Sequence, residues 1–116
     1  MQPVIHYDQI TTAEKIIMSD MRRIPRIETI AKKVNLSSSS LLRQFKLLFG
    51  KRIYEYYIER KMELAKMLLL ENRLQVKEIA QMLGYKQVSP FIKIFTRQHG
   101  YSPGTIKSYR NENKFC

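Results

Sequence analysis

The sequence predicts an all-α protein with seven helices, which form two similar subdomains joined by a long central helix. Apolar residues recur at helical spacing through nearly the whole chain, and no convincing stretch shows the period of two that a half-buried strand requires. Residues that commonly begin or end helices stand where this pattern is interrupted. Two of the helical segments repeat one another, and this repeat predicts the two subdomains.

Two helices are expected before residue 36. Thr11-x-x-Glu14 matches a capping box, so it predicts the start of the first helix. Pro25 suits the beginning of the second helix, and Asn35 suits a left-handed position at its end. The expected apolar faces are Ile16, Ile17 and Met21 in the first helix, and Ile27, Ile30, Ala31 and Val34 in the second.

Five further helices are expected after these two. Ser37 is expected to cap a third helix that runs to about Phe49 and ends at Gly50. The longest helix is expected from about Arg52 to Leu70, before the interruption "ENRLQ". The last three are expected at about 76–83, at about 87–98, and from Ser102-Pro103 onward.

The second and third helices recur later in the chain. "IAKKVNLSSSSLLRQFKLLFG" aligns with "IAQMLGYKQVSPFIKIFTRQHG" after one inserted residue. Each copy has a small residue, Ala31 or Ala80, where two steeply crossing helices would approach each other. Each also has a residue that tolerates positive φ, Asn35 or Gly84, at the tight turn. The repeat therefore predicts two helix-turn-helix subdomains.

The expected organisation has five parts. The two helix-turn-helix subdomains take residues 10–51 and 72–112, and the connecting helix takes residues 52–71. An N-terminal arm or linker remnant is expected at residues 1–9, and a C-terminal tail at residues 113–116.

Positive charge is concentrated in two windows. The chain has 21 basic and 10 acidic residues, a net charge of +11. Residues 29–54 and 79–111 contain no acidic residue, and their basic residues account for the whole net charge. A solvated surface normally mixes both signs, so this placement favours a polyanion that is contacted at two places; an ordinary basic surface is the alternative.

Other function classes find little support. No apolar stretch approaches the roughly 18 residues of a membrane span, and "MQPVIHYDQ" lacks the pattern of a signal peptide. Cys116 is the one cysteine, which fits a reducing cytoplasm and leaves no intrachain disulfide or cysteine zinc site. The two histidines are His6 and His99, the latter expected at a helix end near solvent or the last carbonyls. We expect no enzyme, no metal and no cofactor, because no catalytic constellation can be assembled.

The two repeated helix-turn-helix stretches quoted above, with "YYIERKMELAKMLL" between them and Gly-x-Ser-Pro after them, resemble the DNA-binding module of AraC/XylS-type bacterial transcription regulators. The resemblance covers about residues 10–110. It implies that the second helix of each motif enters a major groove. Two departures stand at Lys61, where the family usually has arginine, and at Ile106-Lys107, where it usually has a tyrosine-arginine pair.

The connecting helix implies a spacing for the two contacts. The helix expected at about 52–70 has 19 residues and would span roughly 28 Å at about 1.5 Å each, somewhat less than the ~34 Å between successive major-groove segments on one face. A DNA site with two parts about one helical turn apart is expected, with some bending of the DNA as an option.

Base-reading residues follow from helix geometry and from the resemblance. With Phe45 facing the core, Ser39 and Arg43 point away from it, and Lys46 lies at the flank. Arg43 is the strongest candidate, because its planar fork can bond O6 and N7 of guanine together; a phosphate contact is the alternative. The family's base-contact positions fall on Ser39, Leu42 and Arg43 in the first motif, and on Val88, Ser89, Pro90, Ile92 and Lys93 in the second.

The two motifs are expected to contribute differently. Val88 and Ile92 can touch thymine methyl groups but cannot form hydrogen bonds to a base. We therefore expect the first motif to supply most of the sequence discrimination, and the second mainly affinity and readout of DNA shape.

Phosphate contacts are expected at the helix starts and along their basic faces. The serines at 37–40 are short enough to let the backbone approach a duplex, and a helix N-terminus favours phosphate; a capping role for all four is the alternative. The expected phosphate-binding residues are Ser37, Ser38, Lys46, Lys51, Arg52, Lys86, Thr96, Arg97, Ser102 and Lys107.

Sequence reasoning thus leads to a bacterial transcription regulator that binds double-stranded DNA sequence-specifically, in the cytoplasm and associated with the nucleoid. A sequence-indifferent basic DNA- or RNA-binding module is the alternative, which Leu42, Val88 and Ile92 keep open. Expected partners besides DNA are RNA polymerase or another regulator, and no membrane. An upstream effector or dimerisation domain is expected outside this chain; a stand-alone regulator is the other option.

Overall fold

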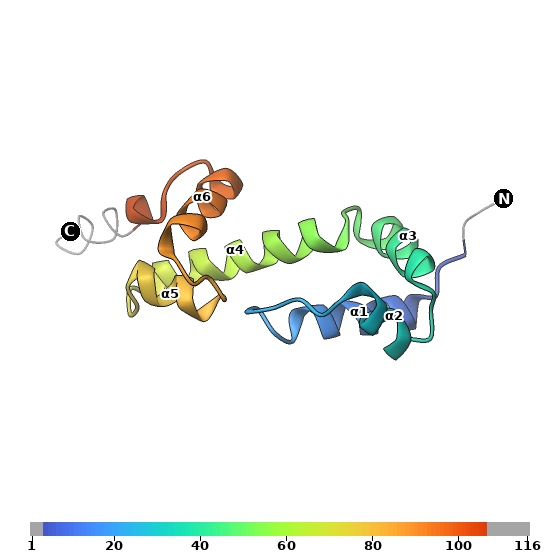
Figure 1. Cartoon of the computed structure of the whole chain (residues 1–116). Coiled ribbons are helices and arrows are strands. Elements are labelled where there is room, and N and C mark those ends of the chain that lie inside the picture. The colour runs from blue at the N-terminus through green and yellow to red at the C-terminus, as the bar shows by residue number, and fades with distance from the viewer. Residues whose placement is uncertain (1–3, 107–116) are drawn as a thin grey trace. The chain divides into compact units, whose positions relative to one another are not determined.

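The computed structural model describes residues 4–106, and the regular structure in this range is helical throughout (Figure 1). The all-α prediction is therefore confirmed. The helices are α1 (Tyr7–Met18), α2 (Ile27–Lys33), α3 (Ser38–Phe49), α4 (Ile53–Glu71), α5 (Val76–Met82) and α6 (Val88–His99). Residues 103–106 begin a further helical stretch at the proline where it was expected.

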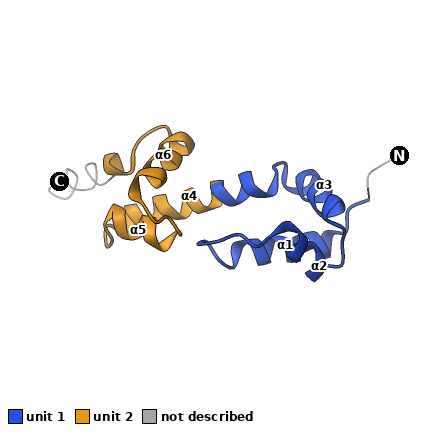
Figure 2. Cartoon of the chain, in the orientation of Figure 1, with its two compact units in different colours: residues 1–58 blue, residues 59–116 orange. Residues whose placement is uncertain are grey.

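The chain forms two compact units, residues 1–58 and residues 59–116 (Figure 2). The first unit holds α1, α2, α3 and the first residues of α4. The second unit holds the remainder of α4 together with α5 and α6. Each unit has its own buried apolar core.

Local signals set the limits of α3 and α6. The Ser37 hydroxyl accepts a hydrogen bond of 3.1 Å from the Ser40 N–H, which satisfies one of the unpaired donors in the first turn of α3. Gly50 ends α3 at φ +76°, and Gly100 ends α6 at φ +81°. Glycine suits both sites because positive φ brings a Cβ atom close to the backbone. The predicted cap and both predicted helix ends are confirmed.

The predicted start of α1 is wrong. The helix begins at Tyr7, so Thr11 lies inside it, and the Thr11 hydroxyl donates a 2.9 Å hydrogen bond back to the Tyr7 carbonyl. Ile10 is fully buried, and its burial draws the preceding turn into the helix. Residues 7–9, expected in an arm, are thus helical, whereas Met21 lies beyond the helix end.

The repeat is longer than the sequence alignment indicated. The helix before each motif, α1 in one unit and the second part of α4 in the other, carries the same buried seam at an offset of 52 residues. In α1 the seam is Ile10, Ala13 and Ile17; in α4 it is Met62, Ala65 and Leu69, and all six side chains are fully buried. Each unit is therefore built on the same three-helix plan.

The third helix of each unit places a phenylalanine at the centre of the core. Phe45 and Phe95 are both fully buried, at an offset of 50 residues. The Phe45 ring centroid lies 4.5 Å from that of Phe49, and the Phe95 centroid lies 4.4 Å from that of His99. His99 Nε2 donates a 2.9 Å hydrogen bond to the Met62 carbonyl of α4. The sequence had predicted that His99 contacts solvent or the last carbonyls of its own helix, so this partner corrects the prediction.

Candidate nucleic-acid interface

The turn between α2 and α3 has the geometry of a Schellman motif. Asn35 adopts the left-handed conformation at φ +58°, as its position in the sequence predicted. The Leu36 N–H donates to the Ala31 carbonyl at 3.0 Å, and the Asn35 N–H donates to the Lys32 carbonyl at 3.3 Å. These bonds fix the direction in which the chain leaves α2, and so the approach of α3.

The turn between α5 and α6 repeats this geometry. Gly84 takes the left-handed position at φ +89°. The Tyr85 N–H donates to the Ala80 carbonyl at 2.9 Å, and the Gly84 N–H donates to the Gln81 carbonyl at 3.1 Å. Both helix-turn-helix turns therefore have the same hydrogen-bond pattern.

The outer face of α3 carries the predicted base-reading residues. Ser39, Leu42 and Arg43 are exposed, and the Leu42 side chain is 45% exposed despite being apolar. The opposite face, with Leu41 and Phe45, is buried. An exposed leucine between a serine and an arginine leaves an apolar surface within a polar and cationic one, which suits a base pair that presents both a methyl group and hydrogen-bonding atoms.

These residues line a groove of about 600 Å³ in the first unit. Its walls come from α2, α3 and the start of α4, and no acidic residue is among the described residues that line it. The lining residues are Ile27, Ser39, Leu42, Arg43, Lys46, Arg52, Ile53 and Tyr54. Five of the predicted DNA-contacting residues thus lie together.

Sequence reasoning missed three of the groove residues. Ile27 was expected on the core side of α2, and Ile53 carried no functional signal. Tyr54 was not among the predicted site residues; its side chain is 63% exposed, whereas Tyr57 is buried. Only the placement of α2 and α4 beside α3 identifies these residues.

The outer face of α6 is less polar. Val88 and Ile92 are each 37% exposed, and Ser89 and Lys93 are exposed beside them. Phe91 and Phe95 point into the core of the second unit. A small hollow of about 110 Å³ at the start of the helix is lined by Lys77, Ala80, Gln81, Tyr85, Lys86, Gln87 and Val88.

The residues expected at phosphates are mostly accessible. Ser38 and Ser102 are half-buried, and the Ser102 hydroxyl oxygen lies 3.2 Å from that of Thr105. Lys107 lies outside the described residues. The exposed members of the set are Ser37, Lys46, Lys51, Arg52, Lys86, Thr96 and Arg97.

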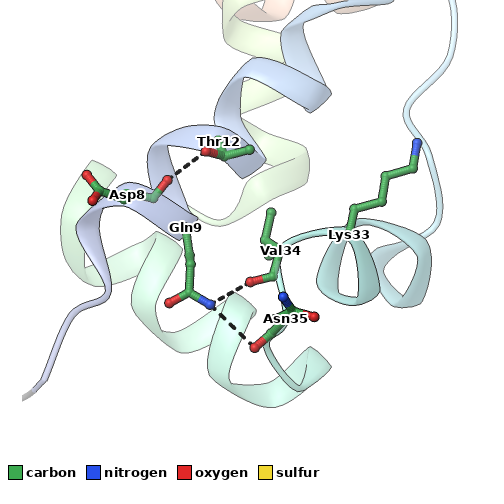
Figure 3. A pocket seen from close by; sticks show the side chains of 6 residues that line it. All are labelled: Asp8, Gln9, Thr12, Lys33, Val34 and Asn35. Carbon is green, nitrogen blue, oxygen red and sulfur yellow. Dashed lines mark hydrogen bonds between the residues drawn. The ribbon is translucent and has the colours of Figure 1, made fainter.

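A side chain of α1 is bonded to the first turn, as Figure 3 shows. Gln9 Nε2 donates a 2.6 Å hydrogen bond to the Val34 carbonyl and lies 3.4 Å from the Asn35 carbonyl oxygen. Gln9 and these two residues line a groove of about 400 Å³ together with Asp8, Thr12 and Lys33.

A side chain of α4 is bonded to the second turn. Lys61 is only 5% exposed, and its Nζ donates a 2.8 Å hydrogen bond to the Leu83 carbonyl. The same Nζ lies 4.9 Å from the centroid of the Tyr85 ring, within the range of a cation–π interaction. Sequence reasoning singled out Lys61 as a departure from the family, without a structural role.

Neither a metal centre nor a membrane span is found in the part of the chain that the structure describes. Within residues 4–106, no three histidine, cysteine, aspartate or glutamate side chains gather closely enough to hold a metal ion. No helix in this range combines the length and apolar character needed to cross a bilayer.

The chain is similar to known bacterial regulators. It is 31% identical to the Msm operon regulatory protein of Streptococcus mutans over 104 residues, which are 90% of this chain and 37% of that protein. It is 31% identical to the xylose operon regulatory protein of Escherichia coli K12 over 88 residues, which are 76% of this chain and 22% of that protein. The chain thus spans well under half the length of both relatives.

Solved structures and family models agree with this likeness. A structure described as a transcriptional regulator of the AraC-type DNA-binding domain-containing proteins, from Chromobacterium violaceum, superposes with a TM-score of 0.79. The match covers 90% of this chain and 93% of that one, and at 21% identity it supports the fold alone. A family model described as a helix-turn-helix domain matches residues 30–109. The chain therefore belongs to the helix-turn-helix family of AraC-type DNA-binding domains.

Proposed function

We propose that this chain is the part of a transcription regulator that binds double-stranded DNA and reads its sequence, with α3 and α6 each entering a major-groove segment of one site. The observation that carries the proposal is that the same turn geometry occurs twice, each time followed by a helix with an exposed face that bears a cation. Two such helices in one chain suit a site with two unlike halves.

In the first half-site, α3 reads the bases. The Arg43 guanidinium bonds O6 and N7 of a guanine, and Leu42 packs against a thymine methyl group. Ser39, in the first turn of the helix, donates or accepts one further hydrogen bond at a base edge. The exposure of all three side chains on one groove wall supports this assignment.

In the second half-site, α6 makes weaker base contacts. Val88 and Ile92 pack against thymine methyl groups, and Ser89 and Lys93 supply the polar contacts. An ammonium is a point charge without a fixed fork, so Lys93 selects a base less strictly than Arg43 does. The second motif accordingly contributes more to affinity than to discrimination.

Phosphate contacts hold both helices in register. Lys46 and Arg52 border the α3 groove, and Lys86 lies at the start of the α6 motif. Lys51, Thr96, Arg97 and the serines at 37, 38 and 102 complete the described set, and Lys107 is assigned on sequence grounds alone. Each neutralised phosphate adds about −0.9 to the slope of log K against log salt concentration.

The wider role follows from the kind of protein this domain belongs to. We place its action at chromosomal DNA in the bacterial cytoplasm, without enzymatic activity or a cofactor. RNA polymerase or another regulator is the proposed protein partner. The two curated relatives are much longer than this chain, which supports a partner domain for effector binding or dimerisation in the complete regulator.

The test is selection of bound duplexes from a random DNA library at near-physiological salt. The expected result is a motif with two parts centred about 10 bp apart. Arg43→Ala should abolish the better-defined part and leave the other. Tight, salt-sensitive binding without any enriched motif would instead support the sequence-indifferent module.

A further inference from the structure

Gln9 and Lys61 occupy equivalent positions in the two three-helix units. Each stands immediately before the first buried residue of its seam, Ile10 or Met62, at the same offset of 52 residues that relates the two seams. The equivalence is not apparent from side-chain chemistry, because one residue is a neutral amide and the other is a cation.

Each side chain donates to the backbone carbonyl at the equivalent position of the turn in its own unit. Val34 and Leu83 are the C-cap residues of α2 and α5, and each directly precedes the left-handed residue of its turn. The carbonyls in the last turn of a helix have no intrahelical partner. The bonds from Gln9 (2.6 Å) and Lys61 (2.8 Å) supply that partner and join the first helix of each unit to its turn.

In the second unit the connection continues to the recognition helix. The Lys61 ammonium faces the Tyr85 ring, and the Tyr85 ring centroid lies 5.6 Å from that of Phe91, which is buried in α6. Lys61 therefore contacts the backbone before the turn and the aromatic side chain that follows it. Displacement of Lys61 would therefore shift the position of the first turn of α6.

We propose that Gln9 and Lys61 are positioning residues for base recognition, each setting the orientation of the recognition helix in its own unit. This inference rests on the proposed function, because orientation matters only if α3 and α6 read bases. Neither side chain needs to touch DNA. Each acts through the turn carbonyl that it holds.

The test compares variants that lose the donor with variants that keep it. Lys61→Met and Gln9→Met retain an unbranched side chain but cannot donate a hydrogen bond, and Lys61→Arg retains a donor. Lys66→Met on α4 is the matched control for Lys61→Met, because it removes a positive charge from the same helix at a residue with no bond to a turn carbonyl in the described contacts. Lys15→Met on α1 is the control for placing a methionine on the helix that carries Gln9.

The readout is discrimination at each half-site, measured as the ratio of Kd values for the selected duplex and for duplexes with one half-site altered. The half-sites are assigned beforehand by Arg43→Ala, which should abolish the part of the motif that α3 reads; the part that remains is assigned to α6. Lys61→Met should reduce discrimination at the α6 half-site about tenfold and leave the α3 half-site unchanged. Gln9→Met should reduce discrimination at the α3 half-site about fivefold, since its bond is neutral and half-exposed.

Lys61→Arg should restore discrimination at the α6 half-site, and both controls should leave the two ratios unchanged. Circular dichroism of each variant separates loss of fold from loss of orientation. If Lys61→Met unfolds, Gln9→Met decides, because its bond lies at the edge of the first unit.

The outcomes separate this inference from the proposed function. A wild-type chain that shows no preference at either half-site would refute the proposed function itself. A wild-type chain that discriminates, with donor-lacking variants that change both ratios equally or neither, would overturn the positioning roles alone.

Discussion

The two recognition helices have the same backbone geometry but begin with different chemistry. In α3 the third helical residue is Ser40, whose N–H is bonded by the Ser37 hydroxyl. In α6 the equivalent residue is Pro90, which has no N–H, and the N-cap residue Gln87 makes no side-chain cap bond. One copy satisfies the donor and the other eliminates it, so equal geometry does not require equal side chains.

The exposed faces of the two helices also differ: that of α3 is the more polar. Leu42 and Arg43 of α3 stand at the positions of Ile92 and Lys93 of α6, at an offset of 50 residues. Two serines in the first turn of α3 are matched by Val88 and Pro90 in α6. The first helix thus has more groups that are able to form hydrogen bonds at a base edge, which supports the proposal that it supplies the larger part of discrimination.

The largest expected effect would break the equivalence of the two cores. Phe45→Ala and Phe95→Ala should each lower the free energy of unfolding by about 3–5 kcal/mol, because both side chains are fully buried at the centre of a unit. Urea unfolding followed by circular dichroism measures the loss. A loss below about 1 kcal/mol at either site would show that this unit does not depend on its phenylalanine.

The next effect sharpens the contrast in base reading. Arg43→Ala should remove about 1–3 kcal/mol of discrimination at one base pair of the selected site. Lys93→Ala should lower affinity more evenly across sequences. Competition binding against single-base variants of the site measures both. Greater loss of specificity for Lys93→Ala than for Arg43→Ala would reverse the assignment of the two motifs.

A smaller and equal effect is expected at the two helix ends. Gly50→Ala and Gly100→Ala should each cost about 1–2 kcal/mol of stability, because alanine at positive φ crowds the backbone. An added Cβ meets no atom within 4 Å at either glycine, so the cost is purely conformational. Thermal unfolding of the two variants compares them, and unequal costs would show that one of the ends carries another constraint.

The smallest effect concerns the two helix starts. Ser37→Ala should destabilise the first unit by about 1 kcal/mol, because the Ser40 N–H loses its partner. Gln87→Ala should have almost no effect, because Pro90 offers no donor there. Equilibrium unfolding of both variants, measured side by side, tests this difference. If the loss in Ser37→Ala comes from the uncapped Ser40 N–H, it should vanish when Ser40 is also replaced by proline, which has no N–H.

The sequence predicted the helices from α3 onward to within about one residue. Their limits depend on local chemistry: the Ser37 cap, and left-handed residues such as Gly50 and Gly100. The start of α1 was mispredicted because Thr11 offers the same local signal, whereas burial of Ile10 decided the outcome. A capping signal can predict a boundary only where tertiary packing does not override it.

The site was predictable in part for the same reason. Helical periodicity places Ser39 and Arg43 on the outer face of α3, whereas Leu42 was assigned only through the resemblance to the family. Tyr54 and Ile27 join the groove only through the packing of three helices. The bonds from Gln9 and Lys61 depend on packing too, and their different side chains hide the equivalence in an alignment.

The turn geometry also has an evolutionary consequence. Each turn is set by backbone hydrogen bonds, a left-handed residue and a donor directed at a carbonyl, and none of these lies on the exposed face of the following helix. Substitutions on that face can therefore change the preferred operator while the scaffold stays constant. The pair Arg43 and Lys93 illustrates such divergence within a single chain, since two copies of one architecture present different cations at the same position.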